Sequence, residues 1–200
     1  MDGTTAPAED GTAASEQVSL DALRQLARAS MFAALIGAGA FIVVPAGPLF
    51  FSLQTMAVSL AGFALGVRQG LTAILIYLAA GFFGLPMFGM GKAGPVAFMG
   101  PTCGFFLGFV FQTAIAGLAH GVRGRSRRIA LMAALGTAGF LVMLAFGAAG
   151  LRITVIPTWK GAFLAGMAAF LPVEPIKLLL AIVVAEGYLR RNPEGGRGDA

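Results

Sequence analysis

Long apolar segments constrain this chain more than any other feature of its sequence. They recur along the chain, and most are close to the length of about 20 helical residues that crosses a hydrocarbon core of roughly 30 Å. Of the residues, 58% are hydrophobic and only 12% are charged, a balance outside the range of soluble domains. The sequence therefore predicts an all-α integral membrane protein.

The apolar pattern predicts six transmembrane helices. Their expected positions are residues 22–44, 51–66, 69–85, 101–120, 129–150 and 161–189. The short GVRQG sequence is expected to turn the chain tightly between the second and third helices. The PAGPLF stretch at 45–50 is expected to be a loop, because two prolines and a glycine disfavour a helix there.

Both ends of the chain are expected to lie outside a transmembrane domain at 18–191. Residues 1–17 are small, polar and acidic, and they lack the basic start and apolar core of a signal peptide. Their low apolar content predicts a disordered tail. Residues 192–200 are expected to form a flexible C-terminal tail.

The basic residues predict which side of the membrane each loop faces. Arginine and lysine accumulate on the cytoplasmic side of membrane proteins. With the N-terminus inside, the outside loops hold only three basic residues, namely Lys92, Arg152 and Lys160. The cytoplasmic parts then hold ten, namely Arg24, Arg28, Arg68, Arg123, Arg125, Arg127, Arg128, Arg190, Arg191 and Arg197. The asymmetry predicts that both termini are cytoplasmic, and it explains the net charge of +5 without a nucleic acid partner.

A segment rich in glycine and proline separates the third and fourth predicted helices. It reads FGLPMFGMGKAGPVAFMGPTCGFF, from Phe83 to Phe106. A simple surface loop is one interpretation, but a solvated loop seldom carries so many methionines and phenylalanines. The favoured interpretation is a re-entrant loop that lines a cavity, where irregular backbone is tolerated at membrane depth. Its glycines would let the backbone approach a ligand and offer N–H donors.

Nucleotide and metal sites are disfavoured by the same segment. GMGKAG matches the spacing of a dinucleotide fingerprint, but Pro86 and Pro95 flank it where a strand and a helix are required. A phosphate-binding P-loop would need Ser or Thr after Lys92, and the chain has Ala93. The single cysteine, Cys103, excludes an internal disulfide and a multi-cysteine metal site.

Two charges lie inside the last predicted helix, in LPVEPIKLLLA. Glu174 and Lys177 are three residues apart and therefore share a helix face. A charge near the bilayer centre costs about 2.5–3.5 kcal/mol, so such residues usually face a cavity or each other. A structural pair that ties the helix into the bundle and a pair that binds a polar ligand both remain open. An acid–base pair of a membrane enzyme is disfavoured, because no nucleophile–base or metal-ligand cluster accompanies it.

Two further sets of residues are candidates with open alternatives. Gln54 and Thr55 either line a cavity or bond helices to one another, and Tyr77 is either a core residue or a hydroxyl on the cavity wall. The first helix carries a stripe of small residues, which lets membrane helices approach closely. The stripe comprises Ser30, Ala33, Ala34, Gly37 and Ala38, and it serves either internal packing or a partner.

From about Ala27 to Arg191 the chain resembles the BioY family, the biotin-specific substrate-binding (S) components of energy-coupling factor (ECF) vitamin importers. The resemblance rests on AALIGAGAFI, FSLQT, GLPMFGMGKAGPVAFMGPTCGFFLGF and FLPVEPIKLLLA. Glu174 stands where the family usually has Asp, and Val173 where it has Gly. Lys92 is the nearest counterpart of a common Arg, and CGFF replaces GGY[LF].

The resemblance implies a non-enzymatic biotin-uptake subunit of the prokaryotic cytoplasmic membrane. Biotin would be the transported ligand, with no cofactor, and a transmembrane coupling protein with a pair of ABC-type ATPases would supply the energy. The implied ligand site comprises Gln54, Thr55, Tyr77, Phe83, Gly91, Lys92, Gly94, Glu174 and Lys177. The implied partner contact comprises Ala33, Ala34 and Ala38. An S component for another vitamin is the alternative.

Overall fold

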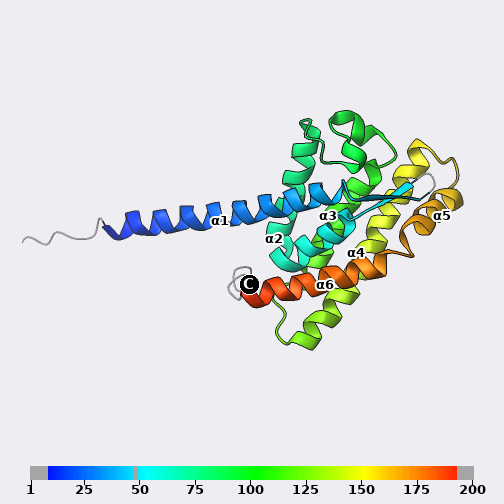
Figure 1. The fold of residues 1–200 in the computed structure, drawn as a ribbon. Helices are drawn as coiled ribbons and strands as arrows, with labels where there is room; N and C mark the ends of the chain where they lie inside the picture. The colour runs from blue at the N-terminus through cyan, green and yellow to red at the C-terminus, as the bar shows by residue number, and fades with distance from the viewer. Residues whose placement is uncertain (1–8, 47–48, 193–200) are drawn as a thin grey trace, which may run out of the picture.

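The computed structural model describes residues 9–46 and 49–192. Within them lie six α-helices: α1 (Glu9–Gly39), α2 (Gln54–Phe82), α3 (Cys103–Gly117), α4 (Arg125–Thr154), α5 (Trp159–Phe170) and α6 (Glu174–Arg191). A hairpin of β1 (Val43–Ala46) and β2 (Leu49–Ser52) joins α1 to α2 (Figure 1). Two 3-10 turns, η1 (Gly89–Gly91) and η2 (Pro95–Met99), lie between α2 and α3. The helix number agrees with the prediction, but several boundaries differ.

The second and third predicted helices form one element, α2, which turns back on itself at Gly66. This glycine has φ +78° and ψ −176°, a backbone conformation that favours glycine. Beyond the turn, Gly70 lies close to Ala61, and Gln54 hydrogen-bonds to Tyr77. The two arms of α2 are therefore antiparallel, with the predicted tight turn between them.

The last predicted helix is broken into α5 and α6. The break spans 171–173 and contains Pro172, which cannot continue the hydrogen-bond ladder of a helix. Pro175 sits in the first turn of α6, where a missing N–H costs nothing. Glu174 consequently lies at the N-terminus of α6, where the helix dipole favours a negative charge, and not in mid-helix as the sequence suggested.

The regions expected to be irregular contain more structure than predicted. Helix α1 starts at Glu9, inside the predicted tail, and its N-terminal half extends beyond the other helices (Figure 1). Alanine, leucine, glutamate and arginine, all strong helix formers, are frequent in this stretch. The predicted loop at 45–50 overlaps the β hairpin, whose register pairs Val43 with Ser52. Residues 1–8 and 193–200, parts of the predicted tails, lie outside the described residues.

The basic segments meet at one end of the bundle. Nδ1 of His120, after α3, lies 3.0 Å from the Phe63 carbonyl oxygen near the turn of α2. Arg128 near the start of α4 is paired with Glu186 near the end of α6. Arg68, Arg123, Arg125, Arg127, Arg190 and Arg191 belong to these same segments. The β hairpin and the glycine-rich segment lie at the other end (Figure 1).

Two described helices, α2 and α4, are long and apolar enough to cross a membrane by length and composition. Because α2 turns at Gly66, each of its arms is shorter than a full span. Large apolar side chains are nevertheless exposed on several helices, including Leu75, Leu107, Leu141, Leu179 and Val183. Such a surface suits lipid better than water.

Glycines let α3 approach α4 closely. A β-carbon at Gly104 would lie 2.9 Å from the amide nitrogen of Gly150, and one at Gly108 would lie 2.8 Å from Cα of Met143. Both distances are shorter than real β-carbons tolerate, so no larger residue fits without separating the helices. Small residues four apart are typical of tightly packed membrane helices.

Gly104→Ala is therefore expected to lower the melting temperature of the detergent-solubilised protein. Overpacking of this kind costs about 1–3 kcal/mol. Gly187→Ala is the matched control, because a β-carbon there meets nothing within 4 Å. The control should be neutral or stabilising, since alanine is the better helix former by about 1 kcal/mol. Equal melting temperatures for the two variants would contradict the close packing of α3 and α4.

Candidate ligand site

A buried polar cluster joins the start of α6 to the start of α2. Nζ of Lys177 lies 2.6 Å from Oε2 of Glu174, and the two side chains are 2% and 8% exposed. Lys177 also donates to the Thr55 hydroxyl at 2.7 Å and to the Ser52 carbonyl oxygen at 3.2 Å. The Thr55 hydroxyl in turn donates to Oε2 of Glu174 at 3.1 Å. Charges this deeply buried are tolerated because each has a charged partner and further hydrogen bonds.

The cluster continues toward the second arm of α2. The Ser52 hydroxyl donates to Oε1 of Gln54 at 3.0 Å, and Nε2 of Gln54 donates to the Tyr77 hydroxyl at 2.5 Å. Gln54, Thr55 and Tyr77 are all buried. Gln54 and Thr55 thus form hydrogen bonds across the bundle and also line a cavity, whereas Tyr77 is a core residue whose hydroxyl joins the network.

Gln112 of α3 completes the cluster and was missed in the sequence. Its amide nitrogen donates to the Thr55 carbonyl oxygen at 3.3 Å and to the Ser59 hydroxyl at 2.9 Å. Its Oε1 is buried and has no hydrogen-bond partner among the described residues. A lone amide in the otherwise apolar run FFLGFVFQTAIA was the available signal, because buried polar groups need partners.

The glycine-rich segment folds back over this end of the bundle. Phe88 is 1% exposed, and its ring packs against Tyr77, Phe98 and Phe106 with centroid separations of 5.6, 5.4 and 4.5 Å. A β-carbon at Gly81 would overlap the Phe88 ring, which explains the glycine there. Gly94 N–H donates to the Gly81 carbonyl oxygen at 2.8 Å and fixes the segment to α2. Its re-entrant position in a membrane stays a prediction.

A small cavity of about 60 Å³ lies between this segment, α2 and α3; we call it the outer cavity. Its lining combines backbone of the segment with aromatic rings and hydroxyls: Ser52, Gln54, Thr55, Phe88, Gly89, Lys92, Thr102, Phe105, Phe106 and Phe109. The exposed Lys92 is the only lysine or arginine in that lining. The outer cavity thus has aromatic walls, a cation and the polar cluster on its border.

The structure unites most, but not all, of the predicted site residues. Gln54, Thr55 and Lys92 line the outer cavity, while Tyr77, Glu174 and Lys177 lie in the polar network beside it. Gly91 and Gly94 shape the segment, with φ of +72° and +78°, and do not line the cavity. Phe83 lines neither this cavity nor the larger one described below: it is 85% exposed and lies edge-on to Phe82. It follows the last residue of α2, so its side chain points away from the bundle.

The aromatic wall on α3 was the main omission. Thr102, Phe105, Phe106 and Phe109 line the outer cavity, and their spacing of three, four and seven residues places them on one helix face. The periodicity is visible in the sequence, but the whole helix is apolar, so its inward face does not stand out.

The small-residue stripe of α1 is divided between two environments. Ala33 is 2% exposed and belongs to the hydrophobic core. It is therefore not available to a partner, contrary to the expectation from the sequence. Ala34 and Ala38 are exposed. The residues of the stripe span a broad arc of the helix surface. Ala33 can therefore face the core while Ala34 and Ala38 face outward.

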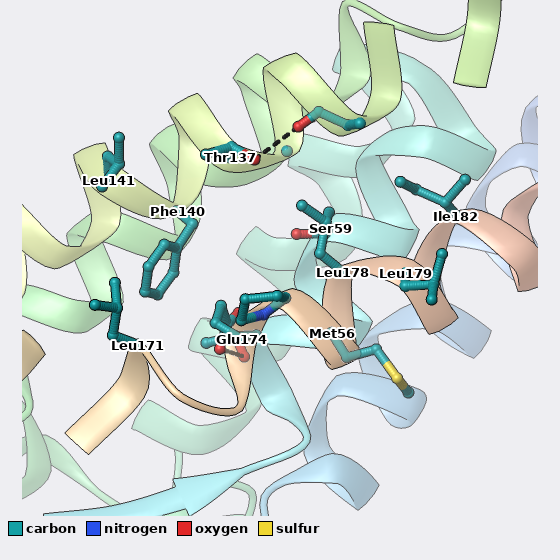
Figure 2. Close-up of a pocket in the computed structure, with 14 residues that line it drawn as sticks. Met56, Ser59, Thr137, Phe140, Leu141, Leu171, Glu174, Leu178, Leu179 and Ile182 are labelled. Atoms are coloured by element: carbon teal, nitrogen blue, oxygen red, sulfur yellow. Dashed lines mark hydrogen bonds between the residues drawn. The ribbon is translucent and has the colours of Figure 1, made fainter. Parts of the chain in front are cut away.

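A second cavity of about 340 Å³ lies on the other side of Thr55, between α2, α4 and α6 (Figure 2). Glu174 and Thr55 contribute to its wall, and the rest is largely apolar, including Phe140, Leu178 and Ile182. The Glu174 cluster therefore separates two hollows. The described residues contain no group of three or more His, Cys, Asp or Glu side chains that could hold a metal ion.

Comparisons with known proteins give consistent results. A model of the BioY family matches residues 11–194. The biotin transporter BioY of Thermotoga maritima is 35% identical over 163 residues, which cover 82% of this chain and 94% of that protein. The biotin transporter BioY of Rhodobacter capsulatus is 35% identical over 186 residues, covering 85% and 95%.

One solved structure has the same fold. It is the S-component for biotin from an ECF-type ABC transporter, with a TM-score of 0.74 and 22% sequence identity. The match covers 86% of this chain and 93% of that one. The predicted all-α fold of six helices is thereby confirmed.

Proposed function

The chain belongs to the BioY family, and we propose that it binds biotin as the S component of an ECF-type importer. The observation that carries the proposal is the buried Glu174–Lys177–Thr55 cluster beside an aromatic cavity whose rim bears Lys92. Biotin has a ureido group at one end, an apolar bicycle, and a carboxylate at the other end. A ligand of that chemistry requires apolar walls with a few polar groups at fixed positions.

Each of the three charged side chains of the site has a partner on biotin. Glu174 accepts a hydrogen bond from a ureido N–H, and Lys177 donates to the ureido oxygen. Thr55 lines the outer cavity and already hydrogen-bonds to both side chains. The bicycle lies against Phe105, Phe106 and Phe109, where its apolar surface leaves water. The carboxylate then faces Lys92.

Binding requires the glycine-rich segment to move. The outer cavity measures about 60 Å³, whereas pockets that enclose small organic ligands measure roughly 300–1,000 Å³. Phe88 fills the space above Gly81, and the Gly94–Gly81 hydrogen bond holds the segment in place. Moving Phe88 outward enlarges the cavity toward Gln54 and Tyr77. The segment then closes on the ligand and offers backbone donors near Gly89.

The basic end of the bundle supports one membrane orientation. We assign this end to the cytoplasm and the end with the glycine-rich segment to the outside, with both termini cytoplasmic. The chain lacks a nucleotide-binding loop, so the proposal assigns ATP hydrolysis to a pair of ABC-type ATPases and coupling to a transmembrane partner. Residues 18–191 form the ligand-binding domain, and the terminal segments are not required for binding.

Copurified ligand tests this function directly. The full chain is expressed in cells grown with biotin, purified in mild detergent, and denatured to release its ligand. Biotin should be recovered at close to one molecule per chain, and titration with riboflavin or thiamin should give no binding. Recovery of another vitamin in place of biotin would support the alternative S component and refute the assignment.

Lys92→Met is expected to weaken biotin binding by about fivefold, corresponding to about 1 kcal/mol for a solvent-exposed ion pair. Biotin methyl ester, which lacks the carboxylate charge, should bind the variant and the parent equally well. Lys92→Arg is the control and should keep the preference for biotin over its ester. Titration calorimetry with both ligands measures these affinities. An equal loss for biotin and its ester would place the carboxylate elsewhere.

A further inference from the structure

Two neighbouring hollows lie along the seam between α4 and α6. A hollow of about 370 Å³ at the basic end is lined by Arg125, Ile129, Leu179, Ile182, Val183, Glu186, Gly187 and Arg190. Its lining shares Leu179 and Ile182 with that of the 340 Å³ cavity of Figure 2, so the two hollows are neighbours along the seam, and we call them together the α4–α6 groove. Leu179 and Val183 are each 61% exposed, so the groove opens onto the surface.

An ion pair spans the groove at one point, and no side chain fills it at another. Nε and Nη2 of Arg128 on α4 donate to the two carboxylate oxygens of Glu186 on α6, at 2.5 and 2.9 Å. This bidentate pair holds the two helices at a fixed separation. One residue further along α6, a β-carbon at Gly187 would meet nothing within 4 Å. The helices therefore leave this part of the seam unfilled.

The basic end of the groove carries excess positive charge. Arg125 is the first residue of α4 and Arg190 lies in the last turn of α6. Neither forms a hydrogen bond or ion pair with another residue of the described chain, and both are exposed. Glu186 is the acidic residue of the lining, and it is already paired with Arg128. The start of α4 has no side-chain cap, so its first N–H groups also face this end.

We propose that the α4–α6 groove binds an anionic phospholipid, with its phosphate at Arg125 and Arg190 and one acyl chain along Ile129, Ile182 and Leu179. Arginine pairs with phosphate through two parallel hydrogen bonds. From Glu174 to Arg190 the groove follows α6 for about 24 Å at 1.5 Å per residue. One leaflet contributes about 15 Å of hydrocarbon, half of the roughly 30 Å core. A chain that starts at Arg190 therefore ends near Leu179, which lines both hollows.

The dimensions favour a lipid over a protein segment. A helix with its side chains is about 10 Å wide, and the Arg128–Glu186 bridge leaves no such width between α4 and α6. An acyl chain is narrower and needs no hydrogen-bond partners. The apolar lining with a cationic end matches the two parts of an anionic lipid.

Lipid retention by the full chain tests the proposal. The protein and its variants are reconstituted in vesicles of phosphatidylcholine and phosphatidylglycerol, extracted in mild detergent, and weighed as intact complexes by mass spectrometry. One variant, Arg125→Gln with Arg190→Gln, removes the charges, and a second, Gly187→Leu, fills the groove. Arg123→Gln with Arg191→Gln is the charge control at the same end, and Ala130→Leu is the bulk control on the exposed side of α4.

Retained phosphatidylglycerol, relative to phosphatidylcholine, should fall at least fivefold in both test variants and less than twofold in both controls. Biotin binding within twofold of the parent shows that each variant is folded. An equal loss in the two arginine pairs would mean general attraction to the basic end and would overturn the site. If the test variants retained phosphatidylglycerol as the parent does but no longer bound the coupling protein, the groove would be a partner surface. That result would also overturn the lipid site. If Gly187→Leu lost biotin binding, unchanged retention in the Arg125/Arg190 variant would suffice to reject the site.

Discussion

Glu174→Gln is expected to weaken biotin binding at least tenfold. The amide keeps the shape of the side chain but loses the negative charge that accepts the ureido hydrogen bond. Charge-assisted hydrogen bonds contribute about 1.5–3 kcal/mol, and 1.4 kcal/mol corresponds to a factor of ten in affinity. Titration calorimetry in detergent measures the change.

The same variant should also melt at a lower temperature than the parent. Lys177 is 2% exposed and lies 2.6 Å from Glu174, so the substitution strands a buried cation beside Thr55 and Ser52. Removing one partner of a buried ion pair costs roughly 3–5 kcal/mol. The loss of stability is therefore expected whether the pair is structural or binds ligand, and stability alone does not distinguish the two roles.

The double variant Glu174→Gln with Lys177→Met separates the roles. It removes the stranded charge, and replacing a buried pair by uncharged residues of similar volume is often neutral for stability. We expect the melting temperature to recover to near the parent value while biotin affinity stays at least tenfold lower. Recovery of affinity together with stability would show that the pair is structural only, and would refute its place in the ligand site.

The sequence predicted the fold correctly where a glycine or proline has only one plausible effect on the backbone. The glycine in GVRQG marked a turn between two apolar runs, and Gly66 provides it with a positive φ. Pro172 lies within the last predicted helix, and whether a proline kinks or ends a helix depends on the packing around it. Here the helix ends, and this places Glu174 at the start of α6 beside Thr55 of α2.

Members of the polar network were predicted where a residue is chemically unusual for its surroundings. Glu174 and Lys177 stand out in an apolar helix, and the structure joins them to Gln54 and Thr55 in one network. Phe83 and Phe106 do not stand out, because an apolar residue in a membrane protein faces either lipid or the core. The direction of the side chain decides whether an apolar residue faces lipid or the core. Phe83 follows the end of α2 and is exposed, whereas Phe106 lies on the inner face of α3. The same ambiguity applies to Ala33, which faces the core, and Ala34, which does not.

Ala34→Leu with Ala38→Leu is expected to reduce biotin uptake by cells at least tenfold while leaving biotin binding by the purified chain unchanged. Both alanines are exposed on α1, and we expect them to contact the coupling protein. Small residues four apart allow two membrane helices to approach closely, and leucine at both positions would separate them. Neither substitution touches the core, so the melting temperature should stay within a few degrees of the parent value.

Two control variants make the uptake result specific. Ala134→Leu with Ala138→Leu places the same change, at the same spacing, on an exposed part of α4 that lines neither the ligand site nor the α4–α6 groove. It should keep both uptake and copurification with the coupling protein. Ala33→Leu, by contrast, enlarges a core residue that is 2% exposed, and should lower the melting temperature by overpacking, at a cost of about 1–3 kcal/mol. Unchanged copurification of the coupling protein with the Ala34/Ala38 variant would mean that this face of α1 contacts lipid, and that coupling uses another surface.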